Sequence, residues 1–97
     1  MVKITVMRKT VYDDLIKKYE NPIENACNIK VGQTFYCDSL EMPNGFCESA
    51  WDTLKPFVNE LLNGGGNFYG GWMKNEKSAM LSCNDGFRPV SFLIEVI

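Results

Sequence analysis

The chain has 97 residues, of which 45% are hydrophobic and 23% are charged, and its formal net charge is −2. This length fits a single domain over residues 1–97, and the hydrophobic content excludes an intrinsically disordered protein. The slight negative charge argues against nucleic-acid binding and against attachment to an anionic membrane surface, because both depend on many Lys and Arg side chains. We therefore expect no nucleic-acid partner and no membrane partner.

The sequence contains no histidine, which removes the commonest general base and the commonest metal ligand. Ser-His-Asp and Cys-His catalytic arrangements are therefore excluded. Residues 1–10 alternate apolar and polar side chains and lack the continuous apolar core of a signal peptide. The expected location is the cytoplasm, where thiols usually stay reduced, so the four cysteines do not predict two disulfides.

The first part of the chain predicts two strands separated by a helix. Residues 2–7 alternate apolar and polar side chains, as in a half-buried strand. Apolar residues at helical spacing predict a helix over 11–19, with Thr10 and Asp13 forming a capping box and an Asn-Pro pair ending it. A loop follows, and then a short β-prone run over 34–37.

The second part predicts a long helix and a hairpin. The helix covers 48–62, where Pro56 should introduce a kink or mark a later start, and the three glycines 64–66 should end it. Strands are expected over 78–83 and 90–97, joined by turn residues. The predicted fold class is α+β, in the order β-α-β-α-β-β, with two helices packed on a small, mainly antiparallel sheet.

Three of the four cysteines lie where functional sites are usually assembled. Cys27 lies in a predicted loop, Cys47 directly precedes the long helix, and Cys83 ends a predicted strand. The positive end of the helix macrodipole also favours a thiolate at Cys47. The first functional hypothesis is therefore a small binding protein in which these three thiols hold zinc or an iron–sulfur cluster. Their spacing is wider than in typical zinc motifs, and Asp85 is a candidate for a fourth ligand.

Two other readings of the thiols stay open. Cysteine is often an inert core residue, which is the best explanation of Cys37 because it shares a strand face with Phe35. Inert thiols would fit a non-catalytic interaction module, a homodimer for instance, that uses the exposed side of the last strand at Leu93 and Ile97. The third reading is a thiol redox protein using Cys47, although the chain has no Cys-x-x-Cys motif.

Further candidate ligand-binding residues lie in the two loops of the second half. The glycine-rich segment 64–72 follows a helix and precedes a strand, which is opposite to the order of phosphate-binding loops. It caps the helix, and Trp72 is a candidate for the rim of an apolar cleft beneath it. Asp85 and Arg88 flank the predicted hairpin turn, where they are either a turn aspartate and an exposed arginine or a site for an anion near Cys83.

Three motifs carry a resemblance over nearly the whole chain: Pro43-Asn44-Gly45-Phe46-Cys47 with Ala50-Trp51, Trp72-Met73-Lys74, and Cys83-Asn84-Asp85-Gly86-Phe87-Arg88-Pro89-Val90. With them the chain resembles a small family of uncharacterised conserved proteins from bacteria and archaea. The resemblance implies cysteines at the positions of Cys27, Cys47 and Cys83, but not at Cys37. The chain departs from the family pattern at Ser82, where a second cysteine is frequent, and at Glu48, where proline is frequent. The resemblance implies no particular reaction.

Overall fold

The computed structural model describes residues 1–22 and 28–97, and these residues form four strands and two helices. In chain order the elements are β1 (Val2–Lys9), α1 (Asp13–Tyr19), β2 (Thr34–Cys37), α2 (Glu48–Leu62), β3 (Ser78–Ser82) and β4 (Val90–Val96). The predicted α+β class and the order β-α-β-α-β-β are confirmed. The last two strands are each slightly shorter than predicted.

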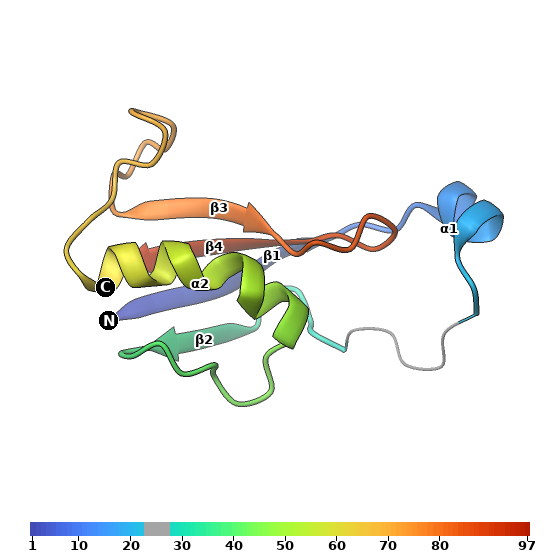
Figure 1. The fold of residues 1–97 in the computed structure, drawn as a ribbon, viewed down its shortest axis with the longest axis horizontal. Helices are drawn as coiled ribbons and strands as arrows, with labels where there is room; N and C mark the ends of the chain where they lie inside the picture. Colours follow the sequence, from blue (N-terminus) through green and yellow to red (C-terminus); the bar gives the residue numbers. More distant parts are fainter. Residues whose placement is uncertain (23–27) are drawn as a thin grey trace.

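The strands form one antiparallel sheet in the order β2-β1-β4-β3. Its two central strands come from opposite ends of the sequence, so both chain termini lie at the same end of the sheet (Figure 1). The backbone N–H of Ile97 donates to the carbonyl oxygen of Met1 at 3.0 Å. The centre of the sheet therefore depends on pairing between segments that are far apart in the chain.

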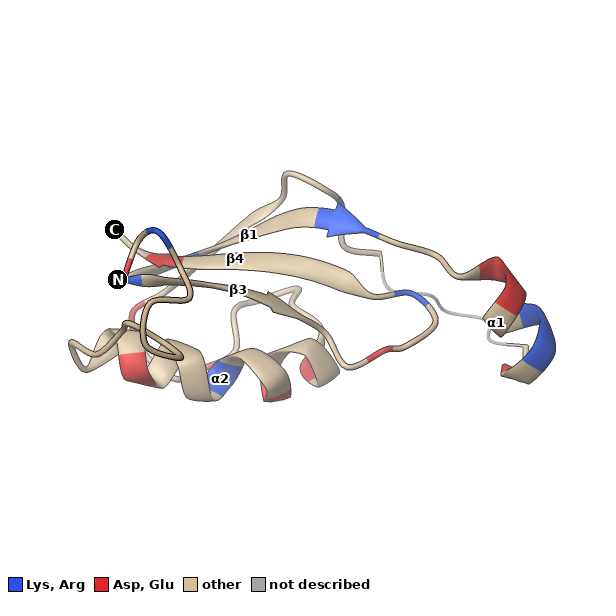
Figure 2. Cartoon of the chain, turned by 90° about the horizontal axis from the view of Figure 1, so that it is seen from above, with Lys and Arg blue, Asp and Glu red and all other residues tan. Residues whose placement is uncertain are grey.

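Helix α2 covers one face of this sheet and forms a second layer with it (Figures 1 and 2). Its apolar stripe, which includes Trp51, Leu54 and Val58, is buried against the inward-facing strand residues such as Ile4 and Ile94. Residues at this spacing lie on one side of a helix, so the alternating strands and the helical stripe enclose one core. In the described part of the chain no helix lies on the opposite face of the sheet.

An aromatic cluster at the start of α2 ties the two layers together. The ring of Phe46 lies 4.9 Å from that of Phe35, 5.3 Å from that of Phe92 and 6.1 Å from that of Trp51, measured between centroids. These rings come from β2, β4 and α2, and all four are buried. Edge-on and tilted packing of this kind adds to the free energy gained by burial alone.

A tight turn delivers Phe46 to this cluster. The backbone N–H of Phe46 donates to the carbonyl oxygen of Pro43 at 3.2 Å, and Gly45 has a φ of +79°. Glycine adopts this left-handed conformation without the steric cost that a side chain would bring. The predicted turn therefore sets where α2 begins, directly after Cys47.

The packing of α1 on the sheet, and its capping box, were wrong predictions. The chain stays extended beyond β1, because Thr10 and Tyr12 donate backbone hydrogen bonds of 2.9 Å to the carbonyl oxygens of Pro89 and Phe87. The helix therefore begins only at Asp13, with Tyr12 as its N-cap and without a side-chain capping hydrogen bond. Continued pairing with the loop after β3 carries the helix past the end of the core.

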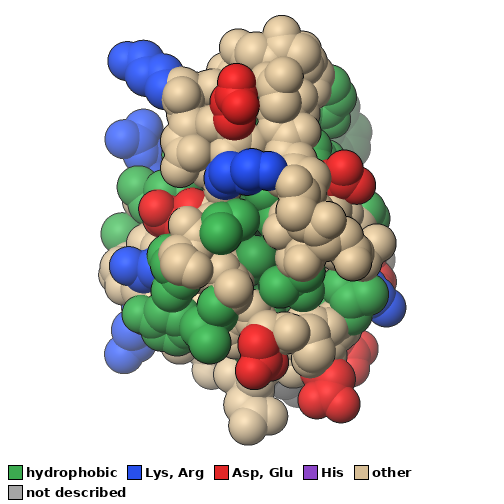
Figure 3. Space-filling view, turned by 90° about the vertical axis from the view of Figure 1, so that its left-hand side faces the viewer, with side chains coloured by type: hydrophobic (Ala, Val, Ile, Leu, Met, Phe, Trp, Pro, Cys, Tyr) green, Lys and Arg blue, Asp and Glu red, His purple; other side chains and the backbone are tan. Residues whose placement is uncertain are grey.

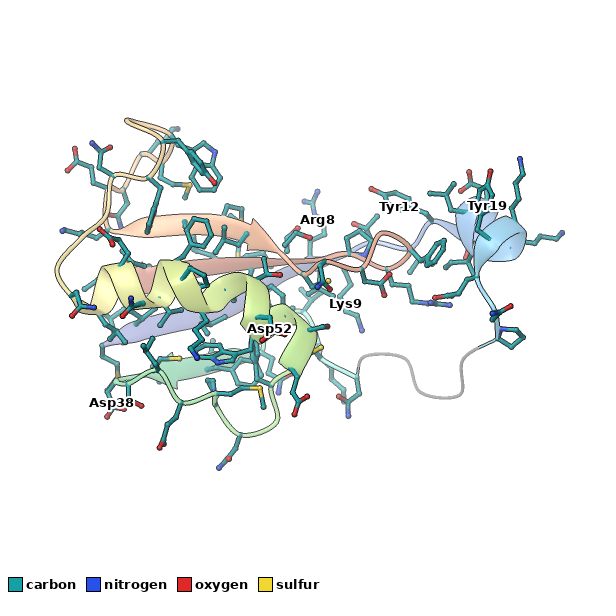
Figure 4. The ribbon with its side chains drawn as sticks, viewed as in Figure 1. Arg8, Lys9, Tyr12, Tyr19, Asp38 and Asp52 are labelled. Carbon is teal, nitrogen blue, oxygen red and sulfur yellow. The ribbon has the colours of Figure 1, made fainter. Side chains whose placement is uncertain are left out.

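We call residues 10–20 the arm. Tyr12 and Tyr19 lie at the far end of the molecule from the core, well away from Asp52 on α2 (Figure 4). No residue of α1 is buried by the described part of the chain. The radius of gyration is 14.2 Å, against about 12.5 Å expected for a compact domain of this length. The arm explains this elongation, because its apolar side chains do not join the core.

Helix α2 matches the predicted bounds and runs through Pro56 without interruption, so the later start considered from the sequence was wrong. The proline lies on the exposed side of the helix. Backbone hydrogen bonds from Gly64 to Leu61 (3.2 Å) and from Gly65 to Glu60 (2.8 Å) close the helix, as the glycine run predicted. No helix among the described residues is long and apolar enough to cross a membrane.

Two helical leucines provide a matched test of this architecture. Leu54 in α2 is fully buried, whereas Leu15 in α1 is 38% exposed. We expect Leu54→Ala to lower the free energy of unfolding by about 2 to 5 kcal/mol, because it leaves a cavity between helix and sheet. Leu15→Ala should cost about 0.5 kcal/mol or less. Urea denaturation of both variants measures the difference, and equal losses would show that α1 belongs to the cooperative core.

Candidate functional site

A small pocket lies between the first turn of α2 and the base of the loop that joins β3 to β4. Its volume is about 40 Å³. The pocket, which we call the thiol pocket, is lined by Cys47, Ser49, Ala50, Cys83, Asp85, Arg88, Val90 and Phe92. Four of the residues singled out in the sequence, Cys47, Cys83, Asp85 and Arg88, therefore meet at one place.

Cys47 is the N-cap residue of α2 and is half-buried. Its carbonyl oxygen accepts the hydrogen bond of the Trp51 N–H at 2.9 Å, which starts the helix. Its Sγ lies 3.1 Å from the Oγ of Ser49, so the two groups share a hydrogen bond. The first-turn N–H groups of a helix favour negative charge. The Cys47 side chain lies beside this end of the helix but makes no capping hydrogen bond to it.

Cys83 directly follows β3 and is held by the start of β4. Its backbone N–H donates to the carbonyl oxygen of Val90 at 3.1 Å. In return the N–H of Val90 donates to the Cys83 Sγ at 3.3 Å, and the thiol makes a long contact of 4.0 Å to the carbonyl oxygen of Arg88. These contacts fix the sulfur at the narrow base of the loop, on the thiol pocket.

Asp85 shapes the loop as the turn aspartate predicted from the sequence. Its Oδ1 accepts hydrogen bonds from the N–H groups of Phe87 at 2.8 Å and Arg88 at 3.3 Å. Arg88 is not an exposed arginine, because its Nη1 lies 2.6 Å from the Oε1 of Glu20 and the two side chains are only 27% and 14% exposed. This ion pair balances the charge of Arg88 and joins the arm to the loop beside the pocket.

Cys37 lies in the core and away from this pocket, as its strand position predicted. It is 3% exposed and packs with the other buried residues beneath α2. Burial raises the pKa of the Cys37 thiol above its ordinary value of 9.0, and the negative charge of Asp38 raises it further. This thiol is therefore kept neutral and shielded.

The three-thiol metal centre finds no support in the described residues. Within residues 1–22 and 28–97 there is no group of three or more Cys, Asp or Glu side chains placed to hold a metal ion. Cys27, the third predicted ligand, lies outside the described residues. Trp72 lies elsewhere and lines a different pocket. Among the described residues, the thiols that meet at the pocket are those of Cys47 and Cys83.

Two residues of this site carried no usable signal in the sequence. Ser49 lies two residues after Cys47 in the first turn of α2. Nothing else in the sequence links Ser49 to the site. Glu20 is separated from its partner Arg88 by most of the chain, and only the extended path of the arm brings the two together. The arm and the β3–β4 loop each carry acidic and basic residues, so charge alone does not single out this pair (Figure 2).

Comparison with known proteins assigns no identity to the site. No protein-family model, curated protein or solved structure matches the chain. The resemblance based on the three sequence motifs therefore stays a prediction, and the function must be argued from the thiol pocket.

The reactivity of the thiols provides a direct test of these environments. In the folded protein, iodoacetamide at neutral pH should modify Cys37 at least about tenfold more slowly than Cys47 and Cys83, because only exposed thiolates react quickly. Mass spectrometry of digested samples measures each rate. In denaturing urea the rates should converge. Equal rates in the folded protein would contradict the burial of Cys37.

The raised pKa of Cys37 also predicts a pH dependence of stability. The thiol ionises at a lower pH in the unfolded chain than in the folded protein. Its contribution to stability is therefore present below 9.0 and is lost as the pH rises through the higher folded-state pKa. Urea denaturation at alkaline pH should show a steeper loss for the unaltered protein than for Cys37→Ala. Parallel curves would contradict the shift.

Proposed function

We propose that this protein is a small thiol–disulfide redox protein in which Cys47 and Cys83 are the reacting pair. The observation that carries the proposal is that both thiols line one small pocket although they come from different elements. Cys47 begins α2, and Cys83 stands at the base of the β3–β4 loop. A redox pair needs two sulfurs, and two of the cysteines that the structure describes line this pocket.

The reaction is a thiol–disulfide exchange with a small-molecule disulfide. The Cys47 thiolate attacks one sulfur of that disulfide, which forms a mixed disulfide and releases the first thiolate of the substrate. Cys83, once deprotonated, then attacks the Cys47 Sγ, which forms the Cys47–Cys83 disulfide and releases the second thiolate. The protein loses two electrons and two protons, and the substrate disulfide is reduced to two thiols.

Each wall of the thiol pocket has a part in this exchange. The Ser49 hydroxyl shares a hydrogen bond with the Cys47 Sγ, and the nearby start of α2 is an environment that favours negative charge. The Val90 N–H donates a hydrogen bond to the Cys83 Sγ and holds it in place. With a volume of about 40 Å³ the pocket admits a sulfur atom and its neighbours, whereas whole small-molecule sites usually have about 300 Å³ or more. The body of the substrate therefore stays outside.

The geometry favours this function over the two other readings. A metal centre needs a further ligand from outside the described residues, because no metal-holding group of three lies within them. Inert thiols would be expected in the core, as Cys37 is, whereas Cys47 and Cys83 are half-buried at a pocket wall. The homodimer, which was expected together with inert thiols, stays a prediction.

The test is an equilibrium titration of the protein in glutathione redox buffers. We expect a Cys47–Cys83 disulfide, identified by mass spectrometry of the digested protein as a cross-linked peptide pair. Its midpoint potential should fall within about −270 to −120 mV, the range of known dithiol redox proteins. Cys47→Ser and Cys83→Ser should each abolish the cross-link.

Cys37→Ala and Cys27→Ser serve as matched controls and should both leave the cross-link intact. Two results would contradict the proposal: a disulfide that pairs Cys47 with Cys27, or stable glutathione adducts on Cys47 and Cys83 without a cross-link. Metal analysis of protein purified without air provides an independent readout. Stoichiometric zinc or iron that is lost in Cys47→Ser would favour the metal centre instead.

A further inference from the structure

A second, larger pocket lies on the face of the sheet that α2 leaves uncovered. Its volume is about 400 Å³, which lies within the range of about 300 to 1,000 Å³ usual for small-molecule sites. We call it the Trp72 pocket; it is lined by Trp72, Met73, Lys74, Asn75, Ser78, Leu93 and Glu95. It shares no residue with the thiol pocket.

The floor of the Trp72 pocket is the outer side of the β3–β4 pair. Ser78 and Glu95 are cross-strand partners, and Leu93 lies on the same side of β4. The hydroxyl of Ser78 donates to the carbonyl oxygen of Asn75 at 2.7 Å. This bond joins the preceding loop to the strand, so the wall and the floor of the pocket are held together.

The wall is built around the indole ring of Trp72. The ring of Tyr69 packs edge-on against it, with 5.3 Å between centroids and 77° between planes. Tyr69 has a φ of +54° and is followed by two glycines with positive φ. A non-glycine residue in this conformation is strained, and such strain is often found where a ligand site is preorganised. Trp72 nevertheless remains 43% exposed, and it lines the pocket.

Two opposite charges border this mostly apolar pocket. Lys74 and Glu95 both line it, yet neither forms an ion pair with any residue that the structure describes. Charges of both signs also border the hydrophobic side chains at the end of the molecule where the termini lie (Figure 3). Lys3 on β1 lies directly across from Glu95, so Glu95 has a cation on the sheet beside it as well as Lys74 at the pocket. A cation and an anion that line one pocket with Trp72 complement a ligand that carries both charges and an apolar body.

We propose that the Trp72 pocket binds a free amino acid with an aromatic or large apolar side chain. The α-ammonium group pairs with the Glu95 carboxylate, and the α-carboxylate pairs with the Lys74 ammonium group. The side chain of the ligand packs against Trp72 and Leu93. Each charged group of the ligand then meets a side chain of opposite charge. Its apolar side chain meets apolar residues of the pocket.

The test compares L-phenylalanine with two analogues that each lack one charge, phenethylamine and 3-phenylpropanoate. Binding is followed by the NMR signal of the Trp72 indole N–H, with the buried Trp51 as an internal reference. Phenylalanine should bind about tenfold more tightly than either analogue, because each charged contact contributes separately. Trp72→Ala should abolish binding.

Charge-neutral variants assign the two contacts. Glu95→Gln should bind phenylalanine no more tightly than it binds 3-phenylpropanoate, since the ammonium group has lost its partner. Lys74→Gln should likewise remove the preference over phenethylamine. Lys30→Gln and Glu41→Gln change exposed charges that do not line the pocket and should leave binding unaltered.

Three results would overturn the proposal. One is equal affinity for phenylalanine and both analogues, which would make the pocket a general apolar surface. Another is no shift of the Trp72 signal at millimolar phenylalanine in the folded protein. The third is a stable dimer in solution that broadens the Trp72 signal, which would assign this face to a second copy of the chain.

Discussion

The burial of Phe46 is the interaction on which the rest of the structure depends. Its ring contacts rings from β2, β4 and α2, so it links both layers of the domain in one place. The residue that follows it is Cys47, the N-cap of α2. Because the aromatic cluster fixes the start of the helix, it also fixes the position of the first thiol over the sheet. The burial of Phe46 therefore determines both the packing of α2 on the sheet and the position of the Cys47 thiol.

The second thiol is positioned by a different constraint, the long-range pairing of the central strands. β4 pairs with β1 on one side and with β3 on the other, and the loop between β3 and β4 carries Cys83 and Arg88. The same loop accepts the backbone hydrogen bonds of the arm and pairs Arg88 with Glu20. The thiol pocket thus shares Phe92 with the aromatic cluster and Arg88 with the ion pair to the arm.

The spacing of apolar residues correctly predicts the buried faces of β1 and α2. The same spacing wrongly predicts that α1 packs on the sheet. The alternation in β1 and the apolar stripe of α2 both correspond to buried faces. The same spacing in α1 predicted packing on the sheet, but backbone pairing with the loop carries that helix beyond the core. The meeting of Cys47 with Cys83 was foreseen only as a hypothesis, because residue spacing says nothing about which distant elements pair.

The strand order has a consequence for how the protein behaves when concentrated. The two longest strands, β1 with 8 residues and β4 with 7, form the middle of the sheet, where neighbours satisfy their backbone groups. The borders are made by β2 with 4 residues and β3 with 5. Short border strands offer few unpaired groups to another chain, which limits edge-to-edge aggregation. The domain therefore keeps an open sheet without presenting a long template for fibril growth.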